Sequence, residues 1–260
     1  GMAMKNILKI MLMMITIFTI AGSAVYAAEI PVSDQDQLIT SRDWTEISNL
    51  QDEMKKEEPD ATIDYDKALK VYVDCNLIKL QTADTKKLTS ALESANYVWV
   101  IPFKMEKTYG MFTVAKGLPL REEAKSVLTK AEQEEVKNHA GKWMITETAE
   151  HTVEPYYDIL LEKREALSDC TRVVLVGSQP GMRQPVALGM DDETARIWIS
   201  LGYQYPVMEK IPETQNVESG VYSFESVADI SDTYIEDSEV STGAGVQSRS
   251  SMKYVAGIGI

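Results

Sequence analysis

Two runs of apolar, β-branched and aromatic residues constrain the fold of this chain more than any other feature. They cover residues 97–103 and 172–176 and begin 75 residues apart. Residues of these types favour strands, and continuous apolar runs favour strands of the buried type. A second apolar run follows each of them across a turn, at 111–115 and 186–188. The pattern therefore predicts two pairs of consecutive strands in one chain.

The order of elements in front of these pairs also repeats. We predict a strand and then a helix before each pair, at 69–80 and 84–95 in the first half and at 142–153 and 156–168 in the second. An amphipathic helix over 120–139 joins the halves. Because the halves share little sequence identity, the repeat is one of element order. If it reflects real symmetry, two strand–helix–strand–strand units share one mostly antiparallel sheet with helices packed on one face, an α+β fold.

The boundaries of this predicted domain follow from changes in composition. A helix over 41–56 opens it and a strand over 195–201 closes it, so we place a single α+β domain at 41–203. Residues 28–40 are polar without periodicity, which predicts a flexible leader. The region 204–260 is polar and rich in Ser, Thr and Gly, with one or two candidate strands that dock back on the domain.

The first 27 residues have the three parts of a secretory signal peptide. Lys5 and Lys9 precede an apolar run over 10–21, and Val25 and Ala27 suit the positions before a cleavage site. The run has about a dozen residues, whereas a membrane span needs roughly 20. We therefore expect cleavage after residue 27, with retention as an anchor as the alternative. Gly1 is typical of a residue left by an expression tag.

This signal predicts Sec export from a bacterial cell, to the cell envelope (periplasmic) or to the extracellular medium. The formal net charge of −14 fits a secreted, acidic protein and argues against nucleic acid as a partner, because phosphates repel it. It argues equally against anionic membrane surfaces. We expect no stable membrane span once the signal is removed.

Two cysteines, Cys75 and Cys170, are present in a chain that is predicted to be exported. An oxidising compartment and an even count favour a disulfide between them. Both residues lie beside apolar runs, where buried free thiols are also common. The sequence leaves both alternatives open, and either one would be structural rather than catalytic.

No catalytic, metal-binding or cofactor motif is present in the sequence. His139 and His151 are twelve residues apart and match no zinc spacing. Ser178 lies in Gly-Ser-Gln-Pro-Gly, which differs from the nucleophile elbow and predicts a turn. We therefore predict no catalytic residue, no metal ligand and no cofactor, and we favour a protein that is not an enzyme.

Tyr203 and Tyr205, in a Pro-containing segment, are the aromatic residues most expected to be exposed, and so are our candidates for ligand binding. Together these observations favour an exported, non-enzymatic binding or interaction module for an extracellular peptide, glycan or protein partner. The alternative is an exported hydrolase with an unrecognised active site. A pocket containing a carboxylate with a shifted pKa would favour that alternative.

Overall fold

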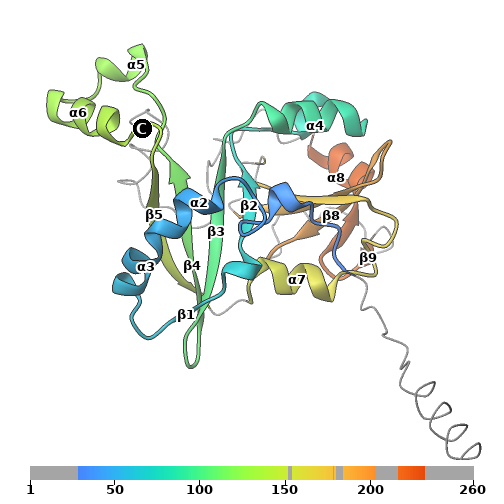
Figure 1. The fold of residues 1–260 in the computed structure, drawn as a ribbon. Helices are drawn as coiled ribbons and strands as arrows, with labels where there is room; N and C mark the ends of the chain where they lie inside the picture. The colour runs from blue at the N-terminus through green and yellow to red at the C-terminus, as the bar shows by residue number, and fades with distance from the viewer. Residues whose placement is uncertain (1–28, 152–153, 178, 180–183, 203–215, 232–260) are drawn as a thin grey trace, which may run out of the picture.

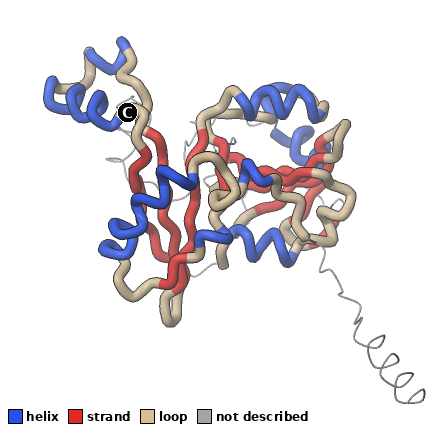
Figure 2. The backbone as a smooth tube through the Cα atoms, viewed as in Figure 1, coloured by secondary structure: helices blue, strands red, loops and turns tan. Residues whose placement is uncertain are grey.

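A single ten-stranded sheet organises the protein (Figures 1 and 2). The structure, a computed structural model, describes residues 29–151, 154–177, 179, 184–202 and 216–231. Its strands are β1 (Thr62–Ile63), β2 (Leu69–Tyr72), β3 (Tyr97–Lys104), β4 (Tyr109–Lys116), β5 (Trp143–His151), β6 (Arg172–Val176), β7 (Val186–Met190), β8 (Ala195–Ser200), β9 (Asn216–Glu218) and β10 (Val221–Ser223).

Short helices connect and cover these strands. The α-helices are α2 (Trp44–Ile47), α3 (Gln51–Glu57), α4 (Thr85–Glu93), α5 (Glu122–Lys125), α6 (Lys130–His139), α7 (Tyr156–Glu162) and α8 (Phe224–Ser231). The 3-10 helices are η1 (Asp34–Asp36), η2 (Ser48–Leu50), η3 (Tyr65–Lys67) and η4 (Ile78–Leu80). Among the described residues, no helix has the length and apolar character that a membrane span requires.

The strands run in the order β5-β4-β3-β2-β6-β7-β8-β10-β9, and β1 adds to β3 beside this path. Every described pair is antiparallel except the central one, β2 with β6, where Val71 lies opposite Leu175. Two antiparallel halves therefore meet at one parallel pair. The prediction of an α+β fold with a mostly antiparallel sheet is confirmed.

The predicted repeat holds for element order but not for strand pairing. The chain runs β2-α4-β3-β4 and later β5-α7-β6-β7. In the first unit β2 pairs with β3, whereas β5 pairs with β4 and β6 pairs with β2. The two units are therefore not spatial equivalents.

The predicted 120–139 helix is two helices, α5 and α6. A capping box begins α6: the Thr129 hydroxyl accepts a hydrogen bond from the Glu132 amide, and the Glu132 carboxylate accepts one from the Thr129 amide. A reciprocal cap of this kind starts a new helix. The amphipathic pattern alone did not reveal this break.

Helices cover both faces of the sheet, not one as predicted. Val174 of β6 packs in a core cluster with Leu88 of α4 and Val227 of α8, while its neighbour Val173 packs in another with Leu160 of α7. Figure 1 shows α4 and α8 on one side of β8 and α7 on the other. A strand that is apolar on both sides has two faces to bury, which is the physical reason for the correction. We call these the α4 face and the α7 face.

The α2 and α3 helices cover the other half of the α4 face. Trp99 of β3 is fully buried in a cluster with Ile47 of α2 and Met54 of α3. Trp99 lies directly opposite Lys70 of β2, and residues that pair across strands share a face of the sheet. The half of the α7 face formed by β3, β4 and β5 carries the cavity described below.

Residues 29–40 pack against the sheet, so the predicted flexible leader is wrong for this stretch. Leu38 is completely buried, and its amide donates to the Ala68 carbonyl at 3.1 Å. Asp36 is also buried, with hydrogen bonds to Tyr72 of β2 and Arg172 of β6. Part of the polar composition of this segment reflects a buried network around Asp36, while Asp34, Gln35 and Thr40 are exposed.

The folded unit also extends past the predicted boundary at residue 203. Tyr222 of β10 lies opposite Trp198 of β8, and both side chains are buried. Helix α8, which the sequence did not predict, closes this end of the α4 face through Val227. The candidate strand at the end of the chain and the predicted signal peptide lie outside the described residues.

Cys75 and Cys170 are both free, buried thiols. Cys75 belongs to the core cluster under α4, and Cys170 to the cluster under α7, so the sheet separates them. The candidate disulfide is therefore not formed, and the alternative of two buried thiols describes the structure.

Candidate functional site

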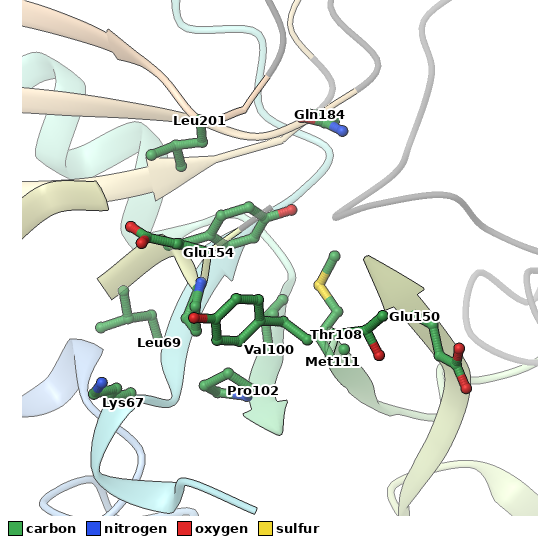
Figure 3. Close-up of a pocket in the computed structure, with 14 residues that line it drawn as sticks. Lys67, Leu69, Val100, Pro102, Thr108, Met111, Glu150, Glu154, Gln184 and Leu201 are labelled. Atoms are coloured by element: carbon green, nitrogen blue, oxygen red, sulfur yellow. The ribbon is translucent and has the colours of Figure 1, made fainter. Parts of the chain in front are cut away.

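A cavity of about 360 Å³ opens on the α7 face, where the two halves of the sheet meet (Figure 3). Figure 3 shows Leu201 and Gln184, from the second half, on one side of it, and Pro102 and Met111, from the first half, on the other. Cavities of this size hold small ligands or single side chains. This cavity is the candidate functional site.

The floor of the cavity is apolar and belongs to the sheet itself. Leu69 and Val100 lie directly opposite each other in β2 and β3, and Pro102 and Met111 do so in β3 and β4. Leu201, just after β8, completes the floor. Leu69, Val100 and Met111 are buried members of the core cluster under α7, so the floor is held as rigidly as the core.

Tyrosine rings and polar side chains surround this floor. The lining tyrosines are Tyr109, from the start of β4, and Tyr156, from the start of α7. The polar lining residues are Lys67, Thr108, Glu150, Glu154 and Gln184. In Figure 3, Glu154 and Lys67 lie on one side of the cavity and Glu150 on the other. The entrance is therefore more polar than the floor, as in sites that orient an amphipathic ligand.

The net charge of this entrance, taken over the described residues that line it, is negative. Lys67 is already paired with Asp158 of α7 at 2.8 Å, and this hydrogen bond raises the pKa of Lys67. Glu154 is exposed, and the negative charge of Glu162 raises the pKa of Glu154. Since Lys67 is neutralised by its own partner, the carboxylates Glu150 and Glu154 determine the field at the entrance.

Gln184 contributes a buried acceptor to the cavity wall. Its Oε1 atom is inaccessible to solvent, and no donor among the described residues reaches it. Because this atom is closed to solvent, a ligand in the cavity reaches it only if the Gln184 side chain moves.

The predicted site residues are distributed differently. Tyr203 and Tyr205 lie outside the described residues, although Leu201, two positions before Tyr203, does line the cavity. Within the described ranges, no group of three or more His, Cys, Asp and Glu side chains is arranged to hold a metal ion. His139 instead contacts the Glu135 carbonyl of its own helix at 2.8 Å.

None of the residues that line the cavity was predicted as a site residue. They come from separate segments between residues 67 and 201, and each segment alone has the pattern of an ordinary strand or loop. Comparison of the chain with protein-family models, with curated proteins and with solved structures found no match. What the site can do chemically therefore rests on its geometry: an apolar floor and an acidic entrance.

Proposed function

We propose that this protein is an exported, non-enzymatic binding module that takes an apolar side chain of an extracellular peptide or protein partner into the cavity. The observation that carries the proposal is the apolar floor of a 360 Å³ cavity, built from the core strands β2, β3 and β4. Burying an apolar side chain there removes it from water at roughly 25 cal/mol per Å² of buried surface. Export rests on the signal peptide that the sequence predicts over residues 1–27.

Among the three partner classes, the floor favours a peptide or protein over a glycan. Sugars present hydroxyl groups that need polar partners in the binding site. The floor of this cavity instead presents the aliphatic side chains of Leu69 and Val100 and the ring of Pro102. A Leu, Met or Phe side chain matches such a surface, and the polar entrance suits the backbone on either side of it.

The charge of the entrance favours a partner with a cation near the apolar group. Glu150 and Glu154 line the cavity, whereas Lys67, the one cation among the described lining residues, is paired with Asp158. The whole chain is acidic as well, with a formal net charge of −14. Complementary charge speeds association and sets the orientation of the bound partner.

Of the two lining carboxylates, Glu154 has a raised pKa, which is the feature that would favour the hydrolase alternative. The main cause is the charge of Glu162, and Glu154 itself is exposed. A catalytic acid can be shifted by burial or by a neighbouring carboxylate, so cleavage of bound peptides is tested directly. Burial does raise the pKa of Glu147 to about 7, but Glu147 is not among the residues that line the cavity.

A display library of random heptapeptides tests the proposal. We expect the selected peptides to combine a large apolar residue with a neighbouring Lys or Arg. Thr108→Trp, which places an indole at the entrance, should weaken binding of a selected, fluorescently labelled peptide roughly tenfold or more. The double variant Glu150→Lys/Glu154→Lys should weaken it similarly. The double change Glu165→Lys/Asp169→Lys, at two exposed positions outside the cavity lining, is the charge-matched control.

Two outcomes would contradict the proposal. Selection of the same peptides by the Thr108→Trp variant would place binding elsewhere on the protein. Cleavage of the selected peptides, detected by mass spectrometry and lost in Glu150→Gln or Glu154→Gln, would establish the hydrolase instead.

A further inference from the structure

A second group of charged and aromatic side chains lies on the opposite face of the sheet, at the centre. Lys70 of β2 projects onto the α4 face between the two halves. Its Nζ atom lies 4.2 Å from the ring centre of Tyr97, 5.3 Å from that of Trp99 and 5.6 Å from that of Tyr72. Strand register fixes this arrangement, because Lys70 pairs with Trp99 and Tyr72 with Tyr97.

The carboxylates nearest to Lys70 are already bound by other groups. Asp36 accepts hydrogen bonds from the Tyr72 hydroxyl at 2.7 Å and from Arg172 at 2.9 and 3.0 Å. Asp43 accepts from the Tyr97 hydroxyl at 2.7 Å and from the Trp99 indole at 3.0 Å. Both acids therefore hold the tyrosines in place and do not pair with the ammonium group.

Lys70 is left with donors but no acceptor. No oxygen atom of the described residues is within hydrogen-bond or ion-pair distance of its Nζ atom, and the side chain is half-buried. An ammonium group carries three N–H donors. The three rings attract the ammonium group through cation–π interactions, which supply no hydrogen-bond acceptor. Its N–H donors are therefore available to an anionic ligand that reaches the half-buried side chain from solvent.

Two further cations flank the ammonium group. Arg172 is anchored by Asp36 beside Tyr72, and Arg42 lies beside Asp43 with an Nε–Oδ1 distance of 3.9 Å. Burial lowers the pKa of Lys70, the charges of Asp36 and Asp43 raise it, and those of Arg42 and Arg172 lower it by smaller amounts. The Arg42 side chain is 87% exposed, so it can swing toward a ligand. The three cations outnumber the two carboxylates, which are already hydrogen-bonded to other groups.

We propose that Lys70 and Arg42 bind an oxyanion group, a carboxylate or a phosphate, on the α4 face, beside the half-buried ring of Tyr97. Lys70 donates to the anion from its half-buried position, and Arg42 closes over it from solvent. Arg172 stays on Asp36 and contributes its charge. Hydrogen bonds between charged groups in such a partly dehydrated place are stronger than those in water. This site is separate from the cavity, which lies on the α7 face.

Lysine-selective NMR tests the proposal on the full chain. The rings shift the side-chain resonances of Lys70 away from those of exposed lysines, which makes them identifiable. Sodium acetate and sodium phosphate are titrated separately at constant ionic strength against sodium chloride. We expect a saturable shift of the Lys70 resonance with at least one of the two, and the stronger binder identifies carboxylate or phosphate as the ligand group.

Variants then separate this site from general charge effects. Arg42→Gln should weaken the binding roughly tenfold. For Lys70→Met the readout is the indole N–H resonance of Trp99, which lies opposite residue 70 and is recorded in the same wild-type titrations. Its saturable shift should be absent in that variant. Lys116→Met is the matched control, because Lys116 lies 5.7 Å from the ring centre of Trp143 on an exposed strand end. A linear drift with both anions, or binding that survives in Arg42→Gln at full strength, would overturn the proposal. The wild-type titration remains decisive even if Lys70→Met does not fold.

Discussion

Tyr72 of β2 donates its hydroxyl hydrogen to Asp36, 36 residues earlier in the chain, over 2.7 Å. Arg172 of β6 binds the other oxygen of the same carboxylate through both Nε and Nη2. Asp36 thus connects η1 to both strands of the central parallel pair. The two halves of the sheet meet at this pair, so the carboxylate joins them through side chains as well as through the backbone.

Replacing this carboxylate should destabilise the whole fold. Asp36→Ala leaves the largely buried charge of Arg172 without its carboxylate and with only the Tyr72 hydroxyl bound, and breaking a buried ion pair in this way costs about 3–5 kcal/mol. Tyr72→Phe, which keeps the ring, should cost about 1 kcal/mol. Urea unfolding measures both. The nearby exposed Asp34→Ala change should stay within about 0.5 kcal/mol of wild type, and an equal loss in both Asp variants would disprove the role of Asp36.

Glu147 should make the stability depend on pH near neutrality. One of its carboxylate oxygens is buried with no donor among the described residues, and burial raises its pKa to about 7 from 4.5. Because the folded state holds this proton more tightly than the unfolded state, the free energy of unfolding should fall as pH rises through that interval. Below about pH 4.5 Glu147 causes no loss of unfolding free energy, and above about pH 7 the loss is complete.

Glu147→Gln removes this dependence. Since the side chain is only half-buried, we expect the variant to be more stable than wild type by about 1–2 kcal/mol near pH 8, and equal to it near pH 4.5. Denaturant unfolding at several pH values measures the difference. Glu150→Gln, an exposed position on the same strand, is the control. A constant gap between wild type and Glu147→Gln at every pH would show that the carboxylate is not the cause.

A strand could be predicted from sequence wherever a single segment contains the complete apolar pattern of a buried strand. The runs over β3 and β6 are continuously apolar, so their strand character and their burial follow from the residues alone. Asp36 shows the opposite case. A charged residue in a polar stretch has the pattern of a flexible leader, and only Tyr72 and Arg172, far away in the chain, make its burial favourable.

The candidate sites were beyond prediction for the same reason. The cavity combines Leu69 and Met111 with Leu201, which come close only after β2 has paired with β6. That pairing is parallel and crosses the two halves, whereas the sequence repeat favoured two similar units. Lys70 likewise gains its three aromatic neighbours through strand register, which periodicity does not specify.

Gly110 of β4 should tolerate no larger residue. A Cβ atom there would lie 2.1 Å from Cζ of the Phe103 ring and 2.7 Å from the Ala149 carbonyl oxygen. Phe103 itself is buried against Phe112, with ring centres 4.9 Å apart, so the ring has little freedom to move. Gly110→Ala should therefore cost about 3 kcal/mol through overpacking.

Gly220→Ala is the contrasting variant for this test. Its φ of 74° strains any L side chain, but no atom lies within 4 Å of the added Cβ. The expected cost is about 1 kcal/mol, from backbone conformation alone. Urea midpoints measure both variants, and a larger loss in Gly220→Ala would reverse the expected order.

The two thiols should stay reduced and unreactive in the folded protein, even after purification without reductant. Cys75 and Cys170 are buried in core clusters on opposite faces of the sheet. Burial raises the pKa of Cys170 to about 11 and also raises the pKa of Cys75. Little reactive thiolate therefore forms near neutral pH. A thiol-reactive dye should label neither residue quickly in buffer, and should label both in concentrated guanidinium. Intact mass without reductant gives the independent check: a mass lower by two hydrogens, with no labelling after unfolding, would mean that the sheet rearranges to allow a disulfide.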